Sequence, residues 1–136
     1  MSETDLYEQL AERHGHYCPM STLGLRLGLE AVKYLSATAE DDWQLCYQAR
    51  TCAVDGIGLA LEKSSLLAEL QVEKQGQHLL LCRSSTGREL SLGLSTEAMQ
   101  MANDYRTFDA AGQQRQLDLL RNAAAERLID ITGLTD

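Results

Sequence analysis

A six-residue segment of the chain, "HGHYCP", concentrates side chains that bind metals or act as nucleophiles. His14, His16 and Cys18 are spaced by two, and Pro19 favours an extended conformation for the residue that precedes it. Residues two apart in an extended segment project to the same side of the chain. Imidazole and thiolate groups together bind zinc or a similar late first-row metal. The spacing therefore predicts a transition-metal site, with zinc as the expected ion.

Cys18 also stands at the predicted start of a helix, because Pro19 suits the first helical position. Unsatisfied N–H groups and the positive end of the helix dipole stabilise an anion at that point. Cys18 is therefore poised as a thiolate, and two roles are open to it. It could bind a metal, or it could be the nucleophile of a Cys–His enzyme.

A second pair of candidate ligands, Cys52 and Asp55, stands at the predicted start of another helix. Being three apart, they share one helix face, and they join the first cluster only if the two helix N-termini meet. The two segments are far apart in the sequence, so spacing alone does not decide this. The other two cysteines, Cys46 and Cys82, fall within strand patterns and are expected as small buried residues.

Hydrophobic periodicity predicts the elements that position these groups. Gly24 and Gly28, four apart on the second helix, predict a closely packed neighbour, either another helix or a second copy of the chain. The last helix is expected to stop at Gly133, and three strands separated by glycine-containing loops are expected to form an antiparallel meander. The expected helices are 5–13, 19–38, one beginning near residue 52, 96–105 and 113–131, and the expected strands are 43–49, 67–73, 78–83 and 89–94.

Composition indicates one α+β domain over residues 1–136, with a small antiparallel sheet packed with several helices. The 20 acidic and 12 basic residues give a net charge of -8, which offers little to nucleic acid or to an anionic membrane. No stretch approaches the ~18 apolar residues of a membrane span, and the acidic N-terminal residues do not resemble a secretory signal. We therefore expect a cytoplasmic protein with no nucleic-acid or membrane partner.

Three segments that follow one another, "HGHYCP", "GLRLG" and "CAVDGI", resemble the FmdE family, which is named for formylmethanofuran dehydrogenase. That family carries H-G-H-x-C-P-G-x-x-x-G-x-R-x-G and then, after a strand, C-x-x-D-A-I-Q running into T-G-C-T. The later segment "GQHLLLCRSSTGRELSL" resembles the family's final hairpin more weakly. The resemblance therefore covers residues 14–94, and residues 95–133 are expected as a helical C-terminal part of the same domain.

The resemblance implies an α+β fold, an intertwined homodimer and a metal-binding pocket. It also implies an accessory or carrier role in redox or one-carbon metabolism linked to molybdenum or tungsten enzymes, with a metalloenzyme or a small-molecule ligand as partner. By position, the implied metal ligands are His14, His16, Cys18, Cys52 and Asp55, with Arg26 close by.

The chain departs from the family pattern where Met20 replaces a glycine, Gly58 a glutamine and Lys63 the third cysteine. A lysine pointing inward could bind an anionic group of a ligand, so Lys63 and Arg26 are the candidate cofactor-binding residues. Two alternatives to a metal-binding domain stay open. One is a module for haem or a pterin-type cofactor, and the other is a thiol enzyme with Cys18 as the catalytic residue.

Overall fold

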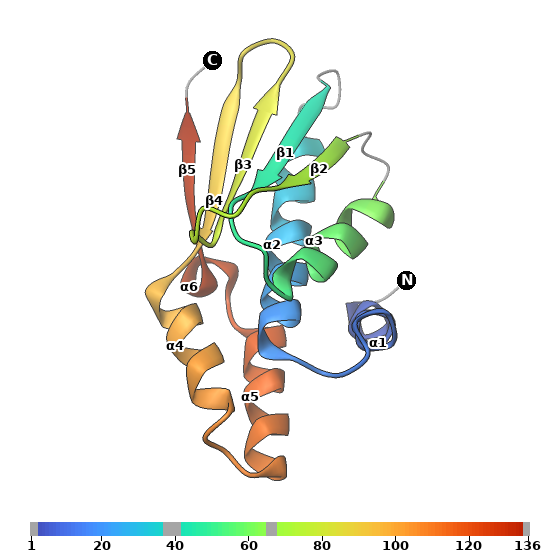
Figure 1. The fold of residues 1–136 in the computed structure, drawn as a ribbon, viewed down its shortest axis with the longest axis vertical. Helices are drawn as coiled ribbons and strands as arrows, with labels where there is room; N and C mark the ends of the chain where they lie inside the picture. The colour runs from blue at the N-terminus through green and yellow to red at the C-terminus, as the bar shows by residue number, and fades with distance from the viewer. Residues whose placement is uncertain (1–2, 37–41, 65–67, 135–136) are drawn as a thin grey trace.

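The computed structural model of the protein describes residues 3–36, 42–64 and 68–134. Figure 1 shows a five-stranded sheet with helices against one face and beyond one end. None of the helices in these ranges is long and apolar enough to cross a membrane. Along the chain the elements are α1 (Glu3–His14), α2 (Pro19–Ser36), β1 (Trp43–Tyr47), α3 (Ala53–Glu62), β2 (Ala68–Val72), β3 (Leu79–Ser84), β4 (Glu89–Leu94), α4 (Thr96–Tyr105), α5 (Ala110–Asn122), α6 (Ala125–Leu128) and β5 (Ile129–Leu134).

The five strands form one sheet in the order β2-β1-β3-β4-β5. β3 is antiparallel to β1 and to β4, and β4 is antiparallel to β5, whereas β1 and β2 are parallel. The prediction of a single α+β domain is confirmed, with a sheet that is mostly antiparallel. The last two residues of the helix predicted over 19–38 and the first residue of the strand predicted over 67–73 lie outside the described residues.

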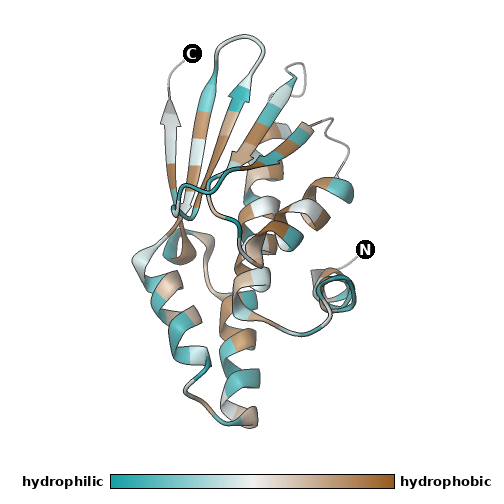
Figure 2. Ribbon diagram, viewed as in Figure 1, coloured by the Kyte–Doolittle hydropathy of each residue, from teal (hydrophilic) through white to brown (hydrophobic). Residues whose placement is uncertain are grey.

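Alternate residues of the strands supply the sheet's side of the core. Leu45 and Tyr47 of β1 are buried, and Leu80 of β3 and Leu92 of β4 belong to the same cluster. The helical side comes mainly from α2, where Leu27 is fully buried. Figure 2 shows this pattern as hydrophobic and hydrophilic bands along the strands. The apolar face of the sheet therefore lies against α2, and the other face is more polar.

The prediction of an antiparallel meander is wrong for its first strand. β2 lies at the edge of the sheet and pairs with β1 in parallel, with Leu45 opposite Leu70. A parallel pair needs a long crossover connection, and α3, which lies between the two strands in the chain, supplies it. β1 therefore occupies the place beside β3 that the meander would give to β2. The hairpin of β3 and β4 forms as predicted.

The single long helix predicted over 113–131 is also wrong. α5 ends at Asn122, the next two residues have extended φ and ψ angles, and the short α6 leads into β5. β5 carries isoleucines at alternate positions, which favour a strand, and it pairs with the edge of β4. Pairing with β4 therefore makes this stretch a strand, although the sequence pattern that precedes it favours a helix. Gly133, expected as the helix stop, lies in β5 opposite Leu90.

The glycines of α2 bring α3 into close contact, as the predicted neighbouring helix. A Cβ at Gly24 would overlap the backbone of Ala53, and one at Gly28 would also meet α3. Gly56 of α3 faces α2 in the same way, because a Cβ there would overlap the backbone of Leu25. The N-terminal ends of α2 and α3 are thereby held side by side. Since a helix of the same chain covers the glycine strip, the strip gives no support to a dimer.

Candidate metal centre

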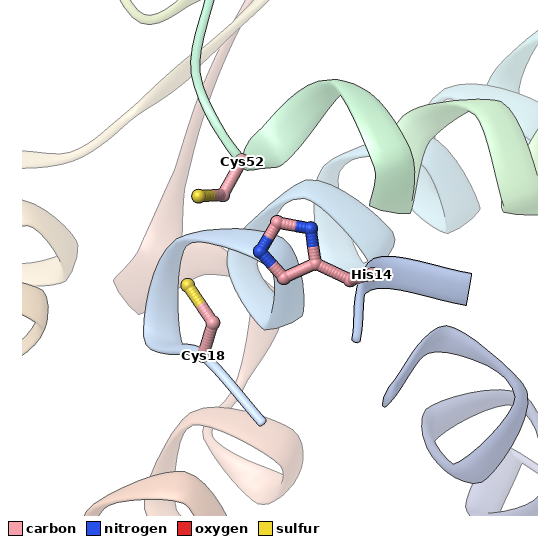
Figure 3. A group of neighbouring side chains, drawn as sticks. All are labelled: His14, Cys18 and Cys52. Atoms are coloured by element: carbon pink, nitrogen blue, oxygen red, sulfur yellow. The ribbon is translucent and has the colours of Figure 1, made fainter. Parts of the chain in front are cut away.

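Three segments that are distant in the sequence meet beside the N-termini of α2 and α3. His14 comes from the end of α1, Cys18 from the residue before α2, and Cys52 from the N-cap of α3. One ring nitrogen and two sulfurs from these residues lie within 4.8 Å of one another. Figure 3 shows them facing one small space. Ligand atoms around tetrahedral zinc lie about 3.3–3.8 Å apart, so an approach of about 1 Å would bring these three groups to coordinating distance.

The imidazole of His14 is fixed by the Asp55 carboxylate. His14 Nδ1 lies 2.7 Å from Asp55 Oδ2. Because an ionised carboxylate only accepts hydrogen bonds, Nδ1–H donates, and Nε2 of the neutral ring keeps its lone pair. Nε2 is buried, and the described residues offer it no hydrogen-bond partner. Metal-binding histidines have this arrangement, in which a carboxylate holds one nitrogen and the other nitrogen binds the ion.

The two cysteines differ in exposure, although each stands at the start of a helix. Cys18 is buried, and its carbonyl accepts the N–H of Thr22, which begins α2. Cys52 is half-buried. Burial raises the pKa of the Cys52 thiol, and the neighbouring Cys18 sulfur and Asp55 carboxylate raise it further. The metal-free site therefore holds Cys52 as a thiol at neutral pH, and a cation bound there would displace its proton.

The end of α1 is tied to α3 where it delivers His14. Besides the His14–Asp55 contact, the neighbouring Arg13 forms an ion pair with Glu62 at the far end of α3. Gly15 follows with a φ of 95°, a left-handed conformation that favours glycine. This turn carries the chain directly from the end of α1 to the segment that precedes α2.

His16 and Asp55, which were also predicted as ligands, contact other groups. Asp55 binds His14 through Nδ1, which places its carboxylate behind the imidazole ring. His16 is exposed, with its ring centroid 4.6 Å from that of His14. Its Nδ1 lies 3.0 Å from the carbonyl oxygen of Tyr17.

Arg26 and Lys63 lie away from the cluster. The Arg26 guanidinium donates to three main-chain carbonyls at the end of α5, in the wall of a cavity of about 500 Å³ between α2 and α5. Lys63 is exposed at the C-cap of α3, whereas Cys52 is the N-cap of the same helix. A ten-residue helix is about 15 Å long, so the two ends are well separated. Lys63 lines a different cavity, of about 310 Å³.

The segment between the histidines and Cys18 has a support that no sequence pattern predicts. The Tyr17 hydroxyl donates to Glu8 at 2.7 Å, which fixes the segment to α1. The guanidinium carbon of Arg121 lies 5.0 Å from the ring centroid of Tyr7 and 5.7 Å from that of Tyr17. These are cation–π distances. Arg121 belongs to α5, far along the chain, so only the fold brings it here.

Comparison with known proteins shows the family to which this chain belongs. The model of the family described as "FmdE, Molybdenum formylmethanofuran dehydrogenase operon" matches residues 13–133. The chain belongs to the FmdE family. Among solved structures, it is similar to a tungsten formylmethanofuran dehydrogenase FmdE-like protein from Syntrophus aciditrophicus, with a TM-score of 0.71 and 18% sequence identity. The similarity covers 98% of this chain and 72% of that chain. At this identity the likeness concerns the fold alone. None of the curated proteins matches the chain.

The FmdE-family match extends beyond the motifs that carry the resemblance in the sequence. Those motifs end near residue 94, whereas the match continues through α4, α5 and α6 into β5. All three residues of the cluster lie within it, because it begins immediately before His14. The His–Cys group, which could hold a metal ion, therefore belongs to the part of the chain that matches the family rather than to an added segment.

Proposed function

We propose that this FmdE-family chain binds one transition-metal ion, with zinc as the expected ion, through His14 Nε2 and the sulfurs of Cys18 and Cys52. The observation that carries the proposal is the buried Nε2, which has no hydrogen-bond partner among the described residues, in a ring that has a nitrogen within 4.8 Å of both sulfurs. Two thiolates and an imidazole are a donor set that zinc prefers. In this proposal Asp55 orients His14 instead of binding the ion.

The fourth position of such a centre is open to an exchangeable ligand. Zinc sites with three protein ligands commonly keep one position for water or substrate. His16 is the candidate to close it, because its exposed ring lies beside that of His14. An open position suits a protein that receives or passes on an ion. It also suits one that presents the ion to a small-molecule ligand.

We infer the biological setting from the family alone. The family description names a molybdenum formylmethanofuran dehydrogenase operon, and the similar solved structure is named for the tungsten enzyme. We propose an accessory or carrier domain for a metalloenzyme of redox or one-carbon metabolism, acting in the cytoplasm as a homodimer. Arg26 and Lys63 would serve small-molecule ligands only in their own cavities, apart from the ion.

A thiol enzyme is the second candidate, and the His14–Asp55 contact favours it. A cysteine beside a histidine that is held by an aspartate has the parts of an activated nucleophile. Cys18 would be the nucleophile and His14 its base, with Asp55 holding the ring. The second sulfur, of Cys52, has no place in that mechanism but is accounted for by a metal centre. Haem and pterin are disfavoured, because three donors converging on one point fit a single ion.

Metal content of the purified protein tests the proposal. We expect about one zinc per chain in protein prepared without chelators or a histidine tag, and loss of that zinc in Cys18→Ser and Cys52→Ser. The matched control is Cys46→Ser, which removes a thiol from the opposite face of the sheet and should keep the metal. Cobalt(II) substitution should give the visible bands of a tetrahedral thiolate site.

Two results would overturn the metal proposal. One is wild-type protein that fails to bind zinc or cobalt in a direct titration, and the other is a Cys18→Ser variant that binds as tightly as wild type. Rapid alkylation of Cys18 at neutral pH, in protein that binds no metal, would instead favour the thiol enzyme. Light scattering tests the homodimer separately.

A further inference from the structure

Two of the three groups in the cluster are thiols that lie against each other. Both Cys18 and Cys52 are free cysteines, and their sulfurs lie within 4.8 Å of each other. Figure 3 shows both sulfur atoms on the same side of the His14 ring. The pair therefore has a second chemistry besides metal binding, because two adjacent thiols can be joined by oxidation.

The helices hold the two cysteines in place without a metal. A Cβ at Gly24 of α2 would overlap Ala53, the residue after Cys52, and a Cβ at Gly56 of α3 would overlap the carbonyl oxygen of Ser21 near the start of α2. The first turns of α2 are thus in direct contact with the first turn of α3. This contact holds the two sulfurs within 4.8 Å of each other, the proximity from which a disulfide can form.

The other two cysteines cannot form such a pair. Cys46 of β1 lies opposite Leu81 of β3, and Cys82 of β3 lies opposite Leu45. Successive side chains of a strand point to opposite faces, so Cys46 is on the polar face while the fully buried Cys82 is on the core face. The chain therefore carries two matched controls for any oxidation at the cluster.

We propose that Cys18 and Cys52 form a reversible disulfide when the metal-free protein meets a hydroperoxide, and that this disulfide and the bound ion exclude each other. The exclusion rests on the proposed metal-binding function, whereas the disulfide itself does not. Oxidation removes two of the three donors, so the oxidised protein cannot hold the ion. Binding of the ion occupies the sulfur lone pairs, so the loaded protein resists oxidation.

The reaction balances with the hydroperoxide as the only oxidant. The thiol of the half-buried Cys52 loses its proton as its sulfur attacks the outer peroxide oxygen, the O–O bond breaks, and the departing oxygen takes up the proton and leaves as an alcohol or water. The sulfenic acid formed on Cys52 is then attacked by the Cys18 sulfur, which displaces water and forms the S–S bond. In total, two thiols lose two electrons and two protons, and the peroxide is reduced to an alcohol or water and a second water. A dithiol reductant reverses the change.

Peptide mapping detects the Cys18–Cys52 disulfide directly. Trypsin cleaves after Lys and Arg, so each of the four cysteines falls on its own peptide: 14–26, 34–50, 51–63 and 75–83. After hydrogen peroxide treatment of metal-free protein, we expect peptides 14–26 and 51–63 to appear as one linked species, two hydrogens lighter than their sum. Dithiothreitol should separate them. Cys46→Ser should behave as wild type, and Cys52→Ser should give no linked species.

Zinc loading and the oxidised protein complete the test. We expect zinc to slow the linkage at least tenfold, and the oxidised protein to take up no zinc until it is reduced. Oxidation of Cys18 and Cys52 only to separate sulfinic acids, or linkage through Cys46, would overturn the disulfide. Equal oxidation rates with and without bound zinc would overturn the exclusion. A disulfide in a protein that never binds metal would refute the proposed function alone, and metal binding without a disulfide would refute this inference alone.

Discussion

Replacing Asp55 should weaken metal binding although Asp55 is not proposed as a ligand. The carboxylate holds His14 Nδ1 at 2.7 Å and so turns Nε2 towards the sulfurs. In Asp55→Asn an amide oxygen can still accept the Nδ1 hydrogen, but the negative charge that makes the ring a stronger donor is gone. In Asp55→Ala both the charge and the acceptor are lost, and the ring is free to rotate.

The structure sets the size of these effects. Loss of a hydrogen-bonded partner behind a metal ligand typically lowers metal affinity 10–100-fold, which is about 1.4–2.7 kcal/mol. The Asp55 side chain is 44% exposed, so water screens part of its charge. We therefore expect a loss of about tenfold for Asp55→Asn and a loss approaching 100-fold for Asp55→Ala, where the ring also loses its orientation.

Glu62→Gln is the matched control. It removes the same charge from the same helix and breaks the ion pair of α3 with Arg13, but it leaves the His14 ring untouched. Zinc affinity should be measured by competition with a chromophoric chelator at one pH and ionic strength, and we expect Glu62→Gln within about twofold of wild type. Equal losses in Asp55→Asn and Glu62→Gln would mean that net charge, not orientation of the ring, controls affinity, and our reasoning would be refuted.

Two further predictions concern stability. Gly56→Ala should lower the free energy of unfolding by about 2 kcal/mol or more, because its methyl group overlaps the backbone of α2. Gly58→Ala, with nothing within 4 Å of the added carbon, should be neutral or stabilising by up to about 1 kcal/mol. Equal free energies for the two variants in urea unfolding would contradict the contact between α2 and α3. Burial raises the pKa of Cys82 from 9.0 to about 12, so the folded state keeps a proton that the unfolded chain loses. The contribution of this thiol to the free energy of unfolding is fully present below pH 9 and is lost as the pH rises to 12, with a loss of about 2 kcal/mol at pH 10.5. In Cys82→Ala the free energy of unfolding should therefore fall less steeply between pH 9 and pH 12. A slope equal to that of wild type would contradict the prediction.

The local half of the site could be predicted from sequence. The proline places Cys18 at the start of α2, because a helix start is a local property. The prediction of an extended segment from His14 through His16 to Cys18 is wrong, because His14 ends α1 and Gly15 turns the chain with a φ of 95°. That Cys52 joins them depends on how α2 packs on α3, which spacing left open and the glycine contacts decide. The role of Asp55 is a matter of side-chain direction, and no residue pattern distinguishes a ligand from a group that orients one.

The fold shows the same division between local and long-range information. The strands β1, β3 and β4 follow their own alternation and were predicted. β5 was not, since its stretch continues a helical pattern and only the edge of β4 makes it a strand. The parallel place of β2 beside β1 likewise comes from the crossover through α3, a property of three elements together. Partners far apart in the chain decided each of these differences.

The meeting of residues 14, 18 and 52 has a consequence for the life of the protein in the cell. An ion held there cross-links the end of α1 to the starts of α2 and α3, and it binds only when all three are in place. Ligand that binds only the folded state stabilises it by about 2.7 kcal/mol at 100 times its dissociation constant. A difference of about 1–2 kcal/mol can change cellular abundance several-fold through proteolysis. The amount of this protein would then rise and fall with the supply of its ion, so that abundance itself reports metal status.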